Sequence, residues 1–270
     1  MPRRTTPPIE IVSPAVPVLV RLLKFNEDSS IIQDTCTALA FLWENYENII
    51  SNDVKRDICE ILSNLFTKQP KATNLMPALR MMERMVAGGA AQIDDVIRCG
   101  VLPGLCAILE NSSKVSIMSK VCLITSYITA GTVSQIAAVL ENGLLNSTVP
   151  GPTSGILICE NAAAAIANVV IHGDPQQVQR VIDNGWVPPL YKKLSKNERG
   201  ILCMLETMNP ILRAGELKVE KKRAKYNRRR GPNPTNEIKE HLRVLTDHIN
   251  QDINQKAKTL WDKYFGMLQS

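Results

Sequence analysis

The sequence is poor in aromatic residues and has no long apolar run. Only 4% of its 270 residues are Phe, Trp or Tyr, whereas 44% are hydrophobic, mostly Leu, Ile, Val and Ala. Side chains of this size suit helices that pack closely together, and the chain is too apolar to be disordered. No stretch reaches the roughly 18 apolar residues of a membrane-spanning helix, and Met1–Glu10 lacks the apolar centre of a secretory signal. We therefore expect a folded protein of the cytoplasm and nucleus with no membrane partner.

The sequence also lacks the patterns of common catalytic and metal sites. It contains no Gly-x-Ser-x-Gly, no phosphate-binding loop, no His-Glu-x-x-His and no dinucleotide-binding glycine pattern. Its seven cysteines are an odd number, and none belongs to a Cys-x-x-Cys pair. Their apolar neighbours indicate buried, reduced thiols instead of a zinc site. The sequence predicts no enzyme, no cofactor and no metal site.

The net charge of +6 comes from one segment. Residues 216–230 hold eight basic and two acidic residues, and the rest of the chain has 24 of each sign. Four interpretations remain open: a solvated flexible loop, a nuclear localisation signal of this protein, a contact with RNA or an anionic surface, and a segment that occupies the protein's own binding surface. Tyr226 alone offers a ring for base stacking, so nucleic acid is not the expected partner. The main basic run consists of Lys221, Lys222, Arg223, Lys225, Arg228, Arg229 and Arg230.

Two series of glycines recur at a nearly constant interval. Gly88, Gly131, Gly173 and Gly215 are separated by 43, 42 and 42 residues, and each follows an apolar run with helical spacing. A glutamine stands four residues after each of the first three, and a second glycine series has spacings of 43 and 42 residues. The interval lies within the roughly 40–47 residues of armadillo and HEAT repeats. The second series consists of Gly100, Gly143 and Gly185, and the glutamines are Gln92, Gln135 and Gln177.

Each interval predicts three helices. A glycine with positive φ ends a long helix, a short helix of about two turns follows, and the second glycine ends that helix. A proline in the first turn opens the next helix, and a polar turn leads into the long third helix. A short first helix before two longer ones favours armadillo repeats. We expect an all-α, right-handed armadillo α-solenoid (an alpha-alpha superhelix) of about six units, in which a loop replaces one helix near 144–155 because of Pro150 and Pro152.

Composition and register divide the chain into four parts. We predict a disordered N-terminal tail at 1–13 and the armadillo array at 14–215. A basic flexible loop at 216–235 then leads to a closing helical repeat at 236–270.

Several ungapped stretches resemble importin-alpha, the adaptor that recognises nuclear localisation signals. They include "ALRMMERMVAGGAAQIDDVIRCGVLPGL", "ITSYITAGTVSQIAAVLENGLL" and "NAAAAIANVVIHGDPQQVQRVIDNGWVPPLYKKL". The resemblance covers roughly 14–268 and corresponds to the family's repeats five to ten. It implies an adaptor that binds peptide segments of other proteins in a concave groove and meets a recycling exportin at its C-terminal repeats. The importin-beta-binding segment and repeats one to four have no counterpart, so we do not expect importin-beta as a partner.

The resemblance also locates the peptide groove. Each third helix of the family offers a Trp and, four residues later, an Asn on the same face, with carboxylates nearby. The Trp rings flank lysine side chains, and the Asn side chains hold the peptide backbone. The Trp positions fall on Thr37, Leu123 and Ala164, and the Asn positions on Phe41, Arg84, Tyr127 and Asn168. Arg80 matches a family arginine, and the acidic positions fall on Ala90, Lys120 and Asn161.

Only Arg80 and Asn168 keep the family's residue at these positions. Because the loss of one stacking site costs about 0.5–2 kcal/mol, the loss of several, together with the acidic partners, should abolish binding of an ordinary basic signal. We therefore expect an importin-alpha-like adaptor whose degenerate groove binds a different peptide. A non-transport armadillo scaffold that has lost cargo and importin-beta binding is the alternative, and nucleic-acid binding through 218–230 is a third hypothesis.

Overall fold

The computed structural model describes residues 7–68, 72–148, 156–186 and 234–266, together with 198, 200–202, 204–206, 208–209 and 211–213. These residues form helices and turns and contain no strand. They fall into two compact units, Met1–Thr148 and Val149–Ser270. The predicted all-α class is confirmed for this part of the chain.

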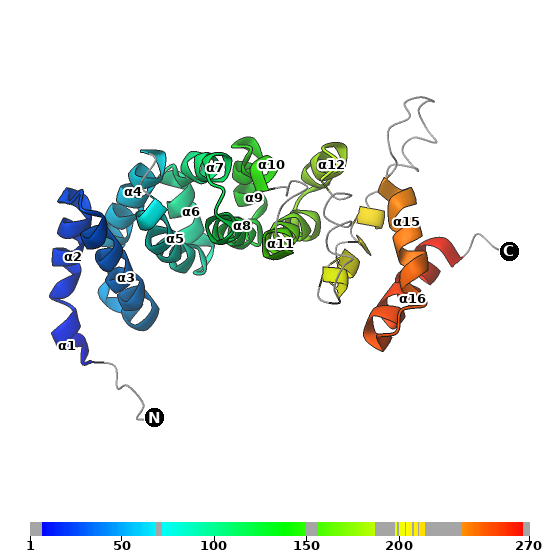
Figure 1. Cartoon of the computed structure of the whole chain (residues 1–270), viewed down its shortest axis with the longest axis horizontal. Helices are drawn as coiled ribbons and strands as arrows, with labels where there is room; N and C mark the ends of the chain where they lie inside the picture. Colours follow the sequence, from blue (N-terminus) through cyan, green and yellow to red (C-terminus); the bar gives the residue numbers. More distant parts are fainter. Residues whose placement is uncertain are drawn as a thin grey trace. The chain divides into compact units, whose positions relative to one another are not determined.

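The first unit repeats its helices at the interval found in the sequence. Three long helices begin 43 residues apart: α3 (Ser29–Tyr46), α5 (Ala72–Val86) and α8 (Val115–Thr129). A second layer contains α2 (Ala15–Phe25), α4 (Asn52–Thr67), α7 (Val101–Asn111) and α10 (Leu144–Thr148). Helices α3, α5 and α8 pack side by side in that order, as do α2, α4, α7 and α10, so the unit has two layers (Figure 1).

Short helices connect successive repeats of this unit. They are α6 (Ala90–Arg98) and α9 (Val133–Glu141), while the single turn η1 (Glu47–Ile49) takes their place one repeat earlier. The glycine after each short helix adopts the left-handed conformation, with φ of 76° at Gly100 and 73° at Gly143. A side chain with a Cβ rarely adopts this backbone geometry, so the second glycine series is confirmed as the helix end.

The first glycine series has a different role from the predicted one. Positive φ occurs only in the second series among the described glycines, so the prediction of a left-handed backbone at Gly88, Gly131 and Gly173 is wrong. At Gly131 an added Cβ would overlap Oε1 of Gln135. The glycine is therefore required because the glutamine four residues later folds back over it, which explains the Gly-x-x-x-Gln spacing.

Gln135 joins two repeats. Its side chain is buried, and Oε1 accepts the Thr132 N–H at 2.9 Å while the Thr132 hydroxyl accepts the Gln135 N–H at 3.4 Å. This reciprocal cap satisfies donors at the start of α9. Nε2 donates to the Ala90 carbonyl at 2.8 Å and to Asp94 Oδ1 at 2.7 Å, so the same side chain ties α9 to α6 of the preceding repeat.

The equivalent glutamine one repeat earlier forms a similar link. Gln92 Nε2 donates to Glu47 Oε1, which also accepts from Lys55 Nζ at 2.7 Å. The hydrogen bond from Lys55 lowers the pKa of the Glu47 carboxyl below its ordinary value, and the hydrogen bond from Gln92 acts in the same direction. Glutamine side chains therefore connect consecutive repeats at two successive junctions of the first unit, from η1 to α6 and from α6 to α9.

The second unit contains α11 (Ile156–His172), α12 (Pro175–Asp183), α15 (Pro234–Leu245) and α16 (Gln251–Phe265). Helix α12 opens with the same reciprocal cap, because Gln177 Oε1 accepts the Asp174 N–H at 3.1 Å and Asp174 Oδ1 accepts the Gln177 N–H at 2.8 Å. Helices α15 and α16 pack on each other, and the Tyr264 hydroxyl hydrogen-bonds Asn209 Oδ1 at 2.6 Å. The helical pair near the C-terminus therefore forms as the pattern indicated, beginning at Pro234.

The structure can be compared with the sequence predictions for the N-terminal tail, for residues 144–155 and for the basic segment. Helix α1 (Ile9–Val12) lies inside the predicted 1–13 tail, and the Tyr46 hydroxyl donates to the Pro7 carbonyl at 2.6 Å, so ordered chain extends to Pro7. Within 144–155 a five-residue helix, α10, is present, and 149–155 lie outside the described residues. The basic segment 216–230 also lies outside them.

Six of the seven cysteines lie in the described part of the chain, and none of these six forms a disulfide. Cys36, Cys59, Cys122 and Cys159 are buried, whereas Cys99 and Cys106 are half-buried. Burial raises the pKa of the Cys36 thiol to about 12 and that of Cys106 to about 11, so both are protonated at neutral pH. The prediction of burial is therefore confirmed for Cys36, Cys59, Cys122 and Cys159, and Cys203 lies outside the described residues.

The Gln135→Ala substitution tests the link between repeats. It leaves the Thr132 N–H without its side-chain partner and removes both hydrogen bonds from Nε2 to α6, so we expect a loss of about 2–3 kcal/mol in the free energy of unfolding. Urea denaturation followed by circular dichroism measures this loss. Gln33→Ala, at an exposed glutamine of α3, is the control and should change stability by less than about 0.5 kcal/mol. Equal effects of the two substitutions would show that the buried amide is not a structural link.

The Glu47→Gln substitution tests the carboxylate that joins η1, α4 and α6. Because the pKa of Glu47 is lowered in the folded state, its stabilising contribution is present above about pH 4.5 and is lost as the pH falls through the folded pKa. We expect the unfolding temperature of the parent to fall more steeply on acidification through this range than that of the variant. Glu141→Gln, at an exposed carboxyl of α9, is the control and should leave the slope unchanged.

Candidate functional site

Six of the predicted groove residues form a regular array on the first unit. Thr37, Arg80 and Leu123 are 43 residues apart, and so are Phe41, Arg84 and Tyr127. The two residues of each helix are four apart and therefore share one face of α3, α5 or α8. Because these helices pack side by side, the positions form two rows that cross three repeats. We call these six residues the ladder face.

The ladder face is accessible but lacks stacking platforms of the expected kind. Leu123 is half-buried, and the other five residues are exposed. The Thr37 hydroxyl donates to the Gln33 carbonyl at 2.8 Å and so serves its own helix. Phe41 is 47% exposed and Tyr127 37% exposed, and the Phe41 ring lies edge-on to Tyr46 at 6.3 Å between centroids. The aromatic rings therefore lie in the second row, where the family has Asn, and not in the first row.

Two carboxylates beside the ladder face are already bound by cations of the chain. Glu83 of α5 pairs with Lys120 of α8 at 2.7 Å, and the two side chains are only 16% and 22% exposed. Glu44 of α3 pairs with Arg84 of α5 at 3.2 Å, with both side chains about half exposed. Both carboxylates are thus paired with basic residues of the neighbouring long helices of this chain.

The sequence reasoning missed Glu44 and Glu83. Both lie three residues after a member of the ladder face, Phe41 and Arg80, so the i, i+3 spacing put them on the same side of their helices. A search of the neighbouring turns for carboxylates, instead of only the family's acidic positions, would have found them. Which basic residue each one pairs with depends on packing between α3, α5 and α8.

Ala164 and Asn168 belong to the second unit. They lie four residues apart on α11, and both are half-buried, as is Asn161 at the predicted acidic position. Their assignment to the family's Trp and Asn positions rests on the resemblance and stays a prediction. The seven basic residues from Lys221 to Arg230 lie outside the described residues, so their role stays a prediction.

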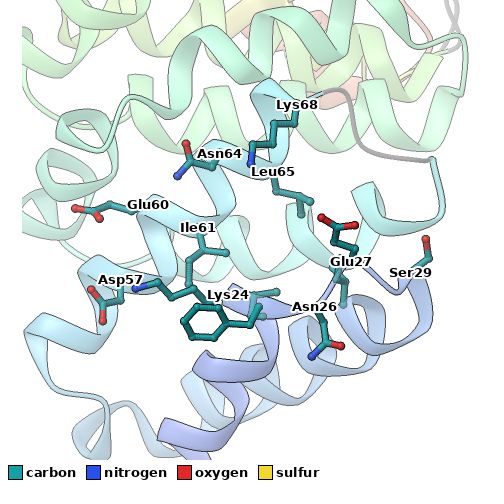
Figure 2. Close-up of a pocket in the computed structure, with 13 residues that line it drawn as sticks. Lys24, Asn26, Glu27, Ser29, Asp57, Glu60, Ile61, Asn64, Leu65 and Lys68 are labelled. Atoms are coloured by element: carbon teal, nitrogen blue, oxygen red, sulfur yellow. The ribbon is translucent and has the colours of Figure 1, made fainter.

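A pocket of about 600 Å³ lies away from the ladder face. It is bounded by the end of α2, the turn before α3 and one side of α4, and Figure 2 shows side chains of both charges around it. Lys24 Nζ lies 5.7 Å from the centroid of the exposed Phe25 ring, and Asp57 and Glu60 face them from α4. The pocket contains no ladder residue, and its mixed charges offer no converging catalytic pair.

The described residues offer neither a metal cluster nor a membrane span. No three His, Cys, Asp or Glu side chains of this part of the chain are close enough together to hold an ion. No helix in it has the length and hydropathy needed to cross a bilayer.

Comparison with known proteins agrees with the fold and the family resemblance. A sequence profile of the Armadillo/beta-catenin-like repeat matches residues 7–40. The chain is 31% identical to importin subunit alpha-4 of Arabidopsis thaliana over 96% of its own length and 48% of the relative's length. It is 34% identical to importin subunit alpha-1a of Oryza sativa subsp. japonica over 53% of its own length and 27% of the relative's. The chain therefore spans no more than about half of either relative.

Solved structures identify the fold independently. The designed armadillo repeat protein YIII(Dq)4CqI superposes with a TM-score of 0.72 at 22% identity, covering 90% of this chain and 97% of that one. Computationally designed armadillo repeat proteins for modular peptide recognition superpose with a TM-score of 0.74 at 21% identity, covering 92% and 99%. The predicted all-α armadillo solenoid is confirmed.

The Lys120→Met substitution tests whether the Glu83–Lys120 pair is structural. It leaves a mostly buried carboxylate unpaired, so we expect a loss of about 1–3 kcal/mol in the free energy of unfolding. Arg84→Met breaks the exposed pair with Glu44 and should cost less than about 1 kcal/mol. Urea denaturation measures both losses, and the single variant Glu83→Gln and the double variant Glu83→Gln/Lys120→Met complete a double-mutant cycle for the buried pair. A coupling near zero for Glu83 and Lys120 would contradict the assignment.

Proposed function

Because this chain is an importin-alpha-like armadillo-repeat protein, we propose that it is a non-enzymatic adaptor that binds extended peptide segments of other proteins along its ladder face. One observation carries the proposal: equivalent side chains, one repeat apart, are presented on three packed helices. An extended peptide presents its side chains at regular intervals and can meet such an array one repeat at a time.

A solved relative of the fold supports peptide binding. The designed armadillo repeat protein YIII(Dq.V1)4CPAF, which superposes with a TM-score of 0.71 at 19% identity, was solved in complex with the peptide (KR)4. The present ladder face differs in chemistry from a site for a basic peptide, because Arg80, Arg84 and the nearby Lys120 are themselves cations. We therefore propose that the face is degenerate for conventional basic localisation signals and accepts a different segment.

The importin-alpha relatives support a role in transport. We propose that the protein brings a bound partner into the nucleus and is present in both cytoplasm and nucleus. A recycling exportin would meet the C-terminal repeats, where Trp261 and Phe265 of α16 lie 5.4 Å apart between ring centroids and Lys239 of α15 lies 5.3 Å from the Phe265 ring. Aromatic side chains are enriched at protein interfaces.

A second function has its own support. The Trp and Asn residues of the family's groove are replaced at most ladder positions, which favours an armadillo scaffold that no longer takes cargo. Such a scaffold would bind partners through surfaces other than the ladder face. The two proposals therefore differ in whether binding depends on the ladder residues.

Peptide display on the purified chain separates adaptor from scaffold. We expect selected peptides that bind the parent and lose at least about tenfold in affinity for the Phe41→Ser/Tyr127→Ser variant, since two exposed aromatic contacts are removed. Val18→Ser, at an exposed apolar residue of α2, is the control and should leave the affinity unchanged. A selection without ladder-dependent peptides would favour the scaffold.

Titration with a basic localisation-signal peptide tests the degenerate site. Fluorescence anisotropy should show binding weaker than micromolar, because the ladder face has no tryptophan and the carboxylates of Glu44 and Glu83 beside it are already paired. Micromolar or tighter binding that is lost in the Phe41→Ser/Tyr127→Ser variant would show that the face still accepts conventional signals.

A further inference from the structure

We infer that the ladder face selects extended peptides that carry carboxylate side chains, and that Arg80 and Arg84 determine this specificity. The inference rests on the proposed peptide-binding function and specifies the class of ligand. It follows from where the charges of the ladder face lie and which of them are already paired.

The central helix of the array supplies two arginines. Arg80 and Arg84 are four residues apart on α5, so their side chains leave the same face of the helix. Helices α3 and α8 flank α5 and carry uncharged residues at the equivalent positions. A guanidinium group binds a carboxylate through two parallel hydrogen bonds, and two such groups one turn apart suit an acidic segment that crosses α5.

Both arginines can reach a ligand. Arg80 is exposed, and no ion pair joins it to another residue in the described part of the chain. Arg84 is paired with Glu44, but the two side chains are 44% and 53% exposed. An ion pair this exposed to water contributes little, so a ligand carboxylate can replace Glu44 or share the guanidinium with it.

The carboxylates of this region do not favour a basic ligand. Glu83 lies between α5 and α8, and its short contact with Lys120 is largely shielded from water. A lysine of a peptide would have to displace Lys120 and leave that cation unpaired beside the face. Asp34 is an exposed carboxylate one turn before Thr37 on α3. It therefore lies on an outer helix of the array and not on α5, which carries the two arginines.

The second row adds contacts for apolar side chains. The exposed rings of Phe41 and Tyr127 lie on either side of Arg84, on α3 and α8. Successive side chains of an extended peptide point in opposite directions, so acidic and apolar residues can alternate along one segment. The chemistry of the face thus fits a segment in which carboxylates meet the α5 arginines and apolar groups meet the flanking rings.

Fluorescence anisotropy with three labelled peptides of equal length tests the inference on the full chain. One peptide alternates Glu with Leu, one Lys with Leu and one Ser with Leu. We expect the Glu peptide to bind most tightly, and Arg80→Glu to weaken it by at least about tenfold through the loss of a charge-assisted contact. Arg98→Glu, at an exposed arginine of α6 paired with Asp95, changes the net charge equally and should leave its affinity within about twofold of the parent.

Two further comparisons make the outcome decisive. If neutralising the seven basic residues from Lys221 to Arg230 abolishes binding of the Glu peptide while Arg80→Glu does not, the basic segment is its site and the inference is wrong. The inference is also wrong if the Ser or Lys peptide binds as tightly as the Glu peptide. In that case ladder-dependent peptides from display would still support the adaptor, whereas their absence would contradict the proposed function itself.

Discussion

The burial of long helices between neighbouring repeats is the interaction on which this structure depends. Helix α5 packs between α3 and α8, and its Ala78, Leu79 and Met82 are completely shielded from water. A single repeat has no partner for such a face, so the helices are stable only as a stack. Because each repeat meets the next in the same way, residues 43 positions apart come into line. The ladder face is a direct consequence of this packing.

The connections between repeats show a second physical constraint. Gln135 folds back over Gly131, caps its own helix and donates to the preceding short helix. Glycine at this position avoids a steric overlap, whereas Gly100 and Gly143 are needed for their backbone conformation. Two glycine series with the same spacing therefore have different causes. Both must be kept for consecutive short helices to lie in register.

The ladder face differs in chemistry from the groove that the family resemblance implies. Function depends on sites more than on folds, and the two rows carry arginine and aromatic side chains where the resemblance leads us to expect tryptophan and asparagine. Lys120 and Arg84 also pair with Glu83 and Glu44, so these two carboxylates are not free to bind a basic ligand. If the protein is an adaptor, as we propose, these charges favour an acidic ligand, and the charge of the ligand is therefore the first property to measure.

The family resemblance singled out Phe41, Arg84 and Tyr127, and the glycine interval and the apolar periodicity determined the helical class and the repeat length from the sequence alone. These properties depend on local conformation and on spacing along one chain, which a sequence displays directly. The pairing of Lys120 with Glu83, the fold of Gln135 over Gly131 and the exposure of Arg80 were decided by the tertiary structure. Each of them depends on which side chain of an adjacent turn or helix comes within a few ångströms, and spacing alone does not specify that distance.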